Sequence, residues 1–273
     1  MSETILSVRD LTRQFKGVLA VDHIRMDLKK GGIYGLIGTN GAGKSTVINM
    51  ISGSISPTEG EILYQGRNVT GTDASARAGA GIARTFQNLR LFSGQTVLDN
   101  VVTASQINRK YNLVEALFSL PRYRREERGF SERAYEALKV MGIEEYAGEP
   151  ADNLPYGLQR RLEIARCLAI QPDLLLLDEP AAGMNPHESL KLVDDIRVIH
   201  REHPDLTILL IEHDMKVVMN LCEYIFVMAS GRIIAEGTPR QIYDSNDVIE
   251  AYLGGIVRRK ENGQRGTDNA KSQ

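Results

Sequence analysis

The chain has 273 residues, of which 42% are hydrophobic and 25% charged, so it has a globular composition and enough length for a large core. Its net charge of −2 provides no basic field for nucleic acid, which argues against a genome-binding function. No segment approaches about 18 uncharged apolar residues, and no basic segment leads into an apolar one at the N-terminus. We therefore expect a cytoplasmic chain unless a partner attaches it to a membrane.

The first residues predict a small antiparallel sheet. Residues 5–8 and 24–28 alternate apolar and polar side chains, and a turn at Phe15-Lys16-Gly17 lies between them. Residues 32–37 form an apolar run typical of a buried strand. Residues 38–46 then read G-T-N-G-A-G-K-S-T, and residues 47–51 continue with helical spacing.

This strand, loop and helix fit the P-loop pattern G-x-x-x-x-G-K-[ST] at every defined position. The glycines let backbone N–H groups turn toward a phosphate, and the helix N-terminus directs its positive end at the same place. Lys44 can reach the β- and γ-phosphates, and the Ser45 hydroxyl can ligate Mg²⁺. The sequence therefore predicts a nucleotide site here.

The next residues predict a strand over 61–64 after a turn at 56–60, a weakly structured stretch over 74–81, and a strand over 82–87. Helical spacing follows in three segments, which Pro121 and Gly129 are expected to break: 97–104, 114–120 and 134–141. We interpret this part as an inserted helical subdomain. The charged run 122–128 mixes both signs and is typical of a solvated face.

The second half predicts βαβ units around a parallel sheet. Helices are expected over 158–170, 189–200 and 215–222, and buried strands over 174–177 and 207–211. A hairpin is expected from 224–228 and 232–236, and the polar sequence from residue 258 predicts a disordered tail. Cys167 and Cys222 lie in apolar helical contexts, which indicates buried, reduced thiols.

Polar groups at three strand ends are candidates for phosphoryl transfer. Asp178 ends a buried strand and can hold Mg²⁺, and the adjacent Glu179 can act as general base toward water. His213 can donate to the γ-phosphate or position the water. Gln87 can contact Mg²⁺ or the water. His23, His187, His200 and His203 have no partners at metal-ligand spacing.

These residues, together with L-P-Y-G-L-Q-R-R at 154–161, occur in the order and spacing of an ABC-transporter ATPase subunit, and the resemblance covers about residues 5–254. It implies an α/β P-loop NTPase fold with a central, mostly parallel sheet, an N-terminal antiparallel β subdomain and an inserted helical subdomain. The implied ATP-binding core spans 1–87 and 166–257, the helical subdomain 88–165 and the tail 258–273.

The resemblance also implies roles for residues. Phe15 would stack on adenine, Gln87 would be the Q-loop, 154–159 the signature, Glu179 the base and His213 the switch histidine. Mg²⁺ would be held by Ser45, Gln87 and Asp178. The ATP-binding set comprises Phe15, Gly38, Asn40, Gly41, Gly43, Lys44, Ser45, Thr46, Tyr156 and Gly157.

Four segments, at 84–87, 161–166, 180–186 and 251–254, are more narrowly similar to the branched-chain amino-acid importers. The segment A-A-G-M-N-P resembles the G-type member of their two ATPase subunits, although Asn185 stands where an aspartate is common. This implies a branched-chain or other hydrophobic amino acid as the solute, and related amide-type substrates stay open.

The signature departs from the family pattern L-S-G-G-Q. Pro155 offers neither a hydroxyl nor a backbone N–H to a γ-phosphate. Leu158 stands where the family has a glutamine, which removes another polar contact unless Gln159 supplies it. Tyr156 in place of glycine is shared with the subfamily. Because a lost hydrogen bond to a charged group costs about 1.5–3 kcal/mol, we expect a weakened ATPase rather than none.

In this family the signature of one subunit closes on the ATP of another, so the resemblance implies a head-to-tail dimer with an identical chain or an F-type paralogue. It also implies transmembrane permease subunits and, indirectly, an extracytoplasmic solute-binding protein. The chain would lie at the cytoplasmic face of the inner membrane. Leu91, Phe92, Phe118 and Leu120 are candidates for the permease-facing surface or for the core of the insert.

Three alternatives stay open. A soluble ABC ATPase of DNA repair or translation usually has a long coiled-coil insertion or two cassettes, and neither is visible. An export or lipopolysaccharide-type subunit shares the same core. A nucleotide-dependent regulatory module with weak hydrolysis is consistent with Pro155.

Overall fold

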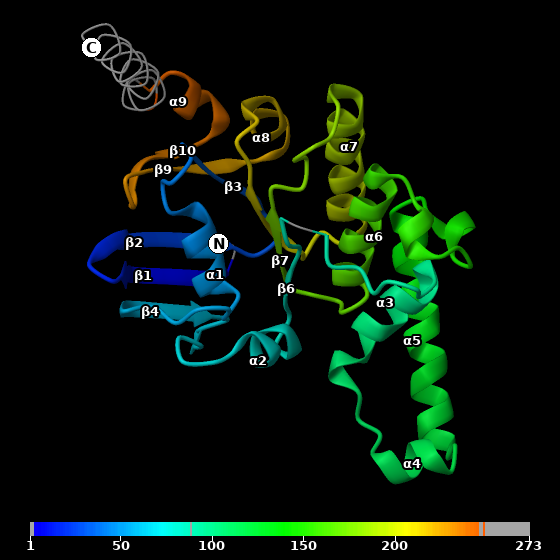
Figure 1. Cartoon of the computed structure of the whole chain (residues 1–273). Helices are drawn as coiled ribbons and strands as arrows, with labels where there is room; N and C mark the ends of the chain where they lie inside the picture. The colour runs from blue at the N-terminus through cyan, green and yellow to red at the C-terminus, as the bar shows by residue number, and fades with distance from the viewer. Residues whose placement is uncertain (1–2, 88, 246–247, 249–273) are drawn as a thin grey trace, which may run out of the picture.

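The computed structural model describes residues 3–87, 89–245 and 248 (Figure 1). A four-stranded sheet contains the N-terminal strands in the order β2-β1-β4-β5, all antiparallel. Its strands are β1 (Thr4–Phe15), β2 (Val18–Lys29), β4 (Glu59–Tyr64) and β5 (Arg67–Asn68). The predicted antiparallel sheet is therefore confirmed, with strands longer than expected because pairing continues to the turn at Lys16 and Gly17.

The second sheet has six strands in the order β10-β9-β3-β8-β7-β6. Its strands are β3 (Ile33–Gly38), β6 (Ile82–Arg84), β7 (Leu174–Asp178), β8 (Thr207–Ile211), β9 (Tyr224–Ala229) and β10 (Arg232–Gly237). Every neighbouring pair is parallel except β9 with β10, which forms the predicted hairpin. All residues of β3, β7 and β8 are buried, because both faces of this sheet are covered.

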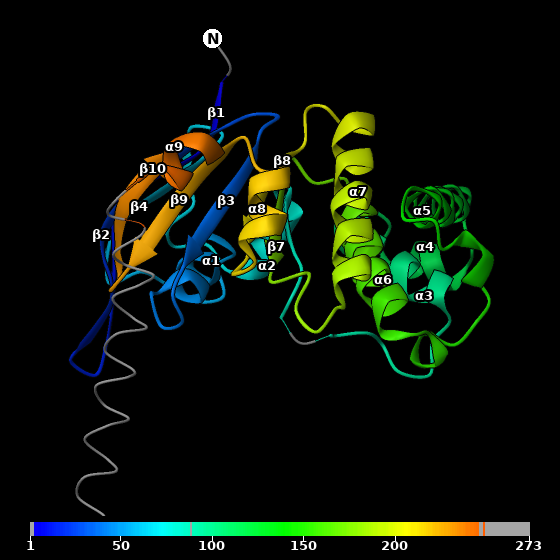
Figure 2. The ribbon, with the colours of Figure 1, turned by 90° about the horizontal axis from the view of Figure 1, so that it is seen from above.

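Two cores lie on the two faces of the six-stranded sheet. On one face, α1 packs between the two sheets with the apolar side chains of β1, β2 and β4. On the other face, α6, α7 and α8 cover β7 and β8, and the core continues into a helical lobe (Figures 1 and 2). The signature helix and the P-loop helix are thus separated by the sheet.

The helices are α1 (Lys44–Ile51), α2 (Ala74–Gly79), α3 (Val97–Ser105), α4 (Leu113–Leu117), α5 (Pro121–Val140), α6 (Tyr156–Leu168), α7 (Pro186–Glu202), α8 (Met215–Leu221) and α9 (Pro239–Tyr243). The 3₁₀ turns are η1 (Gln106–Asn108), η2 (Glu144–Tyr146) and η3 (Ala151–Asn153). None of the helices in the described part of the chain is long and apolar enough to cross a membrane.

Two predictions for residues 74–140 were wrong. The stretch at 74–81 is not weakly structured: it contains α2, which Asp73 caps by accepting from the Ala76 N–H. Gly129 does not break its segment, because burial of the Phe130, Ala134 and Leu138 face of α5 outweighs the roughly 1 kcal/mol cost of one glycine. The predicted break at Pro121 is confirmed, because α4 ends at Leu117 and Pro121 begins the 20-residue α5, where its missing N–H is harmless.

The strand predicted over 82–87 ends at Arg84. Thr85 still bonds to β7, and Phe86 and Gln87 then turn toward α6. The predicted burial of both cysteines is confirmed, and both thiols are free. The proposed subdomain boundaries stay predictions, and the predicted tail over 258–273 lies outside the described residues.

Candidate functional site

The P-loop connects the end of β3 to the start of α1. Gly38, Gly41 and Gly43 have positive φ angles of 154°, 81° and 101°. A Cβ at Gly38 would lie 2.2 Å from the Met228 carbonyl oxygen, and one at Gly43 would lie 2.5 Å from that of Ala20. Only glycine fits these two positions, so the loop conformation follows directly from the motif. No side chain caps α1, which leaves its first N–H groups to face an anion.

Lys44 lies buried at the mouth of this loop. Its ammonium donates to the carbonyl oxygens of Gly38 at 2.8 Å and Thr39 at 3.0 Å. Burial lowers the pKa of Lys44, and the carboxylates of Glu179 and Asp178 act in the opposite direction. Lys44 therefore lies close enough to Asp178 and Glu179 for their negative charges to act on its ammonium. Ser45 and Thr46 follow in the first turn of α1, and Asn40 is exposed on the loop.

Asp178 and Glu179 diverge at the end of β7. Asp178 is buried and accepts from Arg84 Nη2 at 2.8 Å, while another nitrogen of Arg84 donates to Asn49 on α1 at 2.7 Å. Glu179 has a φ of 47°, which is strained for a residue with a side chain. This turn directs Glu179 away from Asp178, and its Oε2 accepts from Gln87 Nε2 at 3.1 Å. The structure therefore brings the predicted base and Q-loop residue together.

His213 lies just beyond β8, and its side chain is 58% exposed. Its Nδ1 is 3.8 Å from Oε2 of the fully buried Glu212. Glu212 also accepts from the backbone N–H groups of Ala181 at 2.8 Å and His213 at 3.2 Å, and its burial raises the pKa of its carboxyl. Sequence analysis missed Glu212. Its signal was an acidic residue directly after an apolar strand and before the candidate histidine.

Phe15 ends β1 beside the turn, and 40% of the residue is exposed. The Arg13 guanidinium lies 4.6 Å from the centre of the ring on one side. An aromatic ring held in this way can accept a stacked base, and the adenine-stacking role of Phe15 stays a prediction.

The signature residues lie away from the P-loop. Pro155 is the N-cap of α6 and makes no side-chain capping bond. The Tyr156 hydroxyl donates to the Ala182 carbonyl at 3.0 Å and accepts from Arg160 Nη2 at 2.9 Å. Because α6 and α1 pack on opposite faces of the sheet (Figure 2), the structure does not bring Tyr156 and Gly157 together with the other nucleotide residues of the same chain.

Arg160 was also missed, although it joins the signature to the Q-loop. Its guanidinium is almost fully buried and donates to the carbonyl oxygens of Phe86, at 2.8 Å, and Gln87. It pairs with buried Glu163 at 3.1 Å, and Glu163 accepts from the Phe86 N–H at 3.2 Å. One side chain therefore fixes the Q-loop backbone relative to α6.

The four apolar residues that were candidates for the permease-facing surface or for the core of the insert differ in burial. Leu91 packs against the core, whereas Phe92, Phe118 and Leu120 are 41%, 68% and 41% exposed. Phe92 lines a groove of about 510 Å³ between α2, β6, α3 and α6. Other residues of this groove include Arg84, Phe86, Arg90, Ile107 and Arg166.

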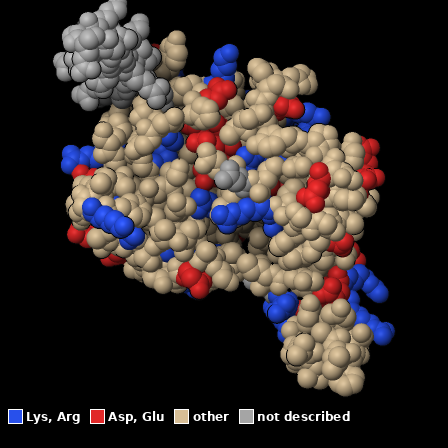
Figure 3. Space-filling view, viewed as in Figure 1, with Lys and Arg blue, Asp and Glu red and all other residues tan. Residues whose placement is uncertain are grey.

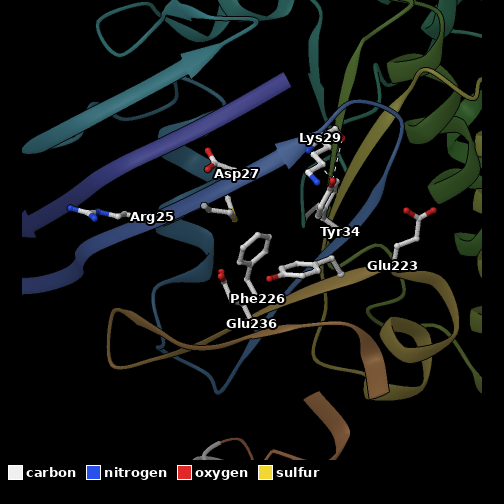
Figure 4. Close-up of a pocket in the computed structure, with 9 residues that line it drawn as sticks. Arg25, Asp27, Lys29, Tyr34, Glu223, Phe226 and Glu236 are labelled. Carbon is white, nitrogen blue, oxygen red and sulfur yellow. Dashed lines mark hydrogen bonds between the residues drawn. The ribbon is translucent and has the colours of Figure 1, made fainter. Parts of the chain in front are cut away.

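A second concavity of about 510 Å³ lies between β2, β3, β9 and β10 (Figure 4). Its lining includes the aromatic residues Tyr34, Tyr224 and Phe226. Arg25 points away from Tyr34 and Phe226 and pairs with Asp10 at 2.8 Å. Tyr34 is the second residue of β3, whereas the P-loop follows the last one. This concavity is therefore separate from the nucleotide site.

The model of the ABC transporter family matches residues 21–182. The chain belongs to this family. It is 45% identical to the high-affinity branched-chain amino acid transport ATP-binding protein LivG of Escherichia coli K12, over 93% of this chain and 99% of that protein. It is 44% identical over the same shares to the corresponding protein BraF of Pseudomonas aeruginosa.

Solved structures agree with this assignment. The crystal structure of the ADP conformation of an ABC-transporter ATP-binding cassette is 29% identical, with a TM-score of 0.78 and coverage of 93% of this chain and 100% of that one. A nucleotide-free cassette gives a TM-score of 0.77 at 28% identity, over 91% of this chain and 98% of that one. The predicted fold and family resemblance are thus confirmed.

Proposed function

We propose that this chain binds and hydrolyses ATP and thereby powers an ABC importer for branched-chain or other hydrophobic amino acids. The observation that carries the proposal is the meeting of Gln87 and Glu179 across 3.1 Å beside the glycine loop that holds Lys44. These groups come from three separate strand ends, β6, β7 and β3. A phosphoryl-transfer site needs a phosphate cradle, a cation site and a group to orient water, and this edge of the sheet offers each.

The residues present fit a Mg²⁺ ion. Ser45, Gln87 and Asp178 offer hard oxygen donors, and no group of three or more His, Cys, Asp or Glu gathers for a metal among the described residues. That donor set suits Mg²⁺, which keeps waters and phosphate oxygens as further ligands. The ion would neutralise charge on the transferred phosphate, with Arg84 holding the Asp178 carboxylate in place.

The remaining residues supply positioning and proton transfer. Lys44 would exchange its two loop carbonyl partners for phosphate oxygens, and Phe15 would stack on the base. Glu179 would accept a proton from the attacking water, which Gln87 orients from the opposite side. His213, whose side chain is 58% exposed, would contact the γ-phosphate, while buried Glu212 holds the adjacent backbone.

A second ATPase subunit completes the site in this proposal. Because α6 and α1 lie on opposite faces of the sheet, Gly157 at the start of α6 can face a γ-phosphate only in another chain. The arrangement supports a head-to-tail dimer with an identical chain or an F-type paralogue. ATP would close the dimer, and hydrolysis would reopen it.

Transmembrane permeases would dock at the groove that contains Phe92, with an extracytoplasmic binding protein acting through them. Phe86, one residue before Gln87, lines this groove, so a segment docked there would lie next to the Q-loop. The chain would then be peripheral at the cytoplasmic face of the inner membrane. The solute class is taken from the names of LivG and BraF, to which the chain is similar throughout.

The enzyme proposal is tested by measuring phosphate release and ATP binding by the wild type, Glu179→Gln and the exposed control Glu61→Gln. We expect Glu179→Gln to reduce hydrolysis at least a hundredfold with ATP affinity retained, because the base is lost and the cradle is intact. Glu61→Gln should match the wild type. Equal, near-zero rates for wild type and Glu179→Gln would favour the alternative of a nucleotide-dependent regulator.

The transport proposal is tested by purifying the chain from membranes and by measuring solute uptake. Recovery with permease subunits, and uptake of branched-chain amino acids that Glu179→Gln abolishes, are the expected results. A chain that never co-purifies with a permease, and that supports no uptake of these amino acids, would contradict the importer assignment.

A further inference from the structure

The end of the helical lobe carries an unusual apolar surface. Four of its side chains are more than half exposed: Leu113 at 84%, Val114 at 59%, Leu117 at 75% and Phe118 at 68%. They lie on α4 and its C-cap, at positions i, i+1, i+4 and i+5, and so share one side of a short helix. No residue of α4 is buried. We name these four residues the α4 tip. Exposed apolar clusters of this kind mark contact sites.

The α4 tip is convex and projects from the body of the molecule. In Figure 1, α4 lies at the far end of the lobe, beyond α3 and the first turns of α5. It projects to the side of the molecule on which α2 lies, and α2 lines the groove proposed for the permease. Figure 3 shows the same end as a tan knob, with basic side chains and some acidic ones where it joins the lobe.

Basic residues surround the tip in the sequence and in space. Residues 109–128 contain six Lys or Arg and three Glu, a net charge of +3 in a chain whose total is −2. The three carboxylates are used inside the lobe. Glu115 accepts from the Asn112 N–H at 2.8 Å, Glu126 from the Lys110 N–H at 2.8 Å, and Glu127 from the Tyr111 hydroxyl at 2.7 Å.

Of the six cations, Arg122 pairs with Glu115 at 3.6 Å and with Glu126 at 3.3 Å, and the others face outward. Arg109, Lys110, Arg124 and Arg125 are exposed and form no ion pair with any described carboxylate. Lys110 and Arg125 also line, with Glu126 and Arg133, an open cleft of about 410 Å³ beside α5. An apolar knob with a cationic collar has the charge and shape that bind an anionic lipid surface.

We propose that the α4 tip inserts into the headgroup region of a membrane that contains anionic phospholipid, with the basic collar on the lipid phosphates. The apolar side chains contribute a binding free energy proportional to the area that they bury in the lipid. The basic collar contributes an electrostatic attraction that salt weakens. A convex surface on a five-residue helix offers a protein partner little area, whereas lipid adapts to it. This contact needs neither ATP nor a permease, so it stands independently of the proposed function.

The chain contains no tryptophan, which permits a direct probe of insertion. Phe118→Trp places an indole on the α4 tip, and Leu190→Trp places one at a comparably exposed leucine on α7. Each purified protein is mixed with vesicles of phosphatidylcholine alone or of equal parts phosphatidylcholine and phosphatidylglycerol. We expect a blue shift of the emission, and quenching by brominated acyl chains, for Phe118→Trp with anionic vesicles and not for Leu190→Trp.

Flotation with the same vesicles then separates the two contributions. Leu117→Gln with Phe118→Gln should weaken binding about ten- to a hundredfold, whereas the control Leu190→Gln should not. The double variant Arg124→Gln with Arg125→Gln should bind anionic vesicles more weakly, and its binding should depend less on salt. The control double variant, Arg67→Gln with Arg240→Gln, should bind like the wild type. Because all these side chains are exposed, we expect unchanged unfolding midpoints, and the single variant Phe118→Gln replaces any pair that fails to fold.

Several results would overturn the proposal. Wild-type protein that fails to float with anionic vesicles excludes the lipid contact, as does equal flotation of the Leu117/Phe118 variant. Equal binding to neutral and anionic vesicles refutes the role of the collar. Binding only to vesicles that contain reconstituted permease would assign the α4 tip to that protein instead.

Discussion

Pro155 is the residue at which this chain departs most consequentially from its family pattern. It is the N-cap of α6 with φ −53° and ψ 149°, a backbone conformation that serine also adopts. A serine there could cap the Leu158 N–H in the free protein or present its hydroxyl to a γ-phosphate. Proline can make neither contact. The missing contact to the γ-phosphate affects the ATP that the signature faces, which in the proposed dimer is bound to the other subunit.

We expect Pro155→Ser to raise ATP turnover about ten- to a hundredfold in the assembled protein, with a further gain on addition of Leu158→Gln. Turnover rises because the restored contacts are to a charged phosphate. The free energy of unfolding should change little, because the helix cap that serine adds and the backbone rigidity that proline gave nearly cancel. The measurement is steady-state phosphate release with ATP affinity, and Pro57→Ser is the control. Unchanged turnover and affinity in Pro155→Ser would show that the signature proline is neutral.

Tyr156 has a role within its own chain that its position in the signature does not suggest. Its hydroxyl connects the Ala182 carbonyl, three residues after Glu179, with Arg160, which holds the Phe86 and Gln87 carbonyls. A change at the signature can therefore reach both sides of the Gln87–Glu179 contact through two side chains.

We expect Tyr156→Phe to lower the unfolding temperature by about 2–4 °C, because removing one partly exposed hydroxyl bridge costs about 1 kcal/mol. If the bridge positions the Q-loop, turnover falls as well while ATP affinity is kept. Calorimetry and phosphate release on the same preparation provide both values. Tyr243→Phe, at a tyrosine that is 75% exposed on α9, is the matched control and should change neither.

Among the elements, α2 best illustrates what the sequence could not predict. Its six residues have little apolar pattern, and its place depends on Arg77, which is 1% exposed. The guanidinium donates to the carbonyl oxygens of Met50 and Ile51 at the end of α1, and to those of Val69 and Thr70. Burial lowers the pKa of Arg77 without removing its charge, so this residue serves as the C-terminal cap of α1.

We expect Arg77→Ala to destabilise the protein by about 3–5 kcal/mol, because it leaves four carbonyl groups without this donor and opens a cavity. Urea unfolding monitored by circular dichroism measures the change. Arg67→Ala, at an exposed arginine of β5, should lie within about 0.5 kcal/mol of wild type. If Arg77→Ala lowers the free energy of unfolding by less than about 1 kcal/mol, water must bind the carbonyl groups in place of the guanidinium.

The predictable part of the structure was local. The buried strands, the P-loop and the acidic pair after β7 follow from short runs of residues, since each needs only an apolar segment and the residue types beside it. The contacts of Arg160 join residues more than 70 positions apart, and the turn that directs Glu179 toward Gln87 depends on its position beside β8. No pattern in one sequence specifies such contacts, so the place of α2 and the role of Arg160 were found only in three dimensions, whereas Glu212 had a local signal that was overlooked.

At the scale of the whole molecule, one core joins the helical lobe to the sheet. Cys167 on α6 and Cys222 beside β9 belong to the same cluster of buried side chains, which also contains residues of α3, α5, α7 and β8. Burial raises the pKa of each thiol to about 12. The two cysteines therefore report on the two ends of one core.

We expect both thiols to react with an aromatic disulfide reagent at pH 8 at least about a hundredfold more slowly in the folded protein than in urea. The cause is burial, which removes access and suppresses the thiolate that attacks the reagent. The variants Cys167→Ser and Cys222→Ser each leave one thiol, so that the urea midpoint of exposure can be measured for each end of the core. Because the cluster is continuous, the two midpoints should coincide with each other and with the loss of helical circular dichroism. Exposure of Cys167 at a clearly lower urea concentration than Cys222 would instead show that the helical lobe opens while the sheet stays folded.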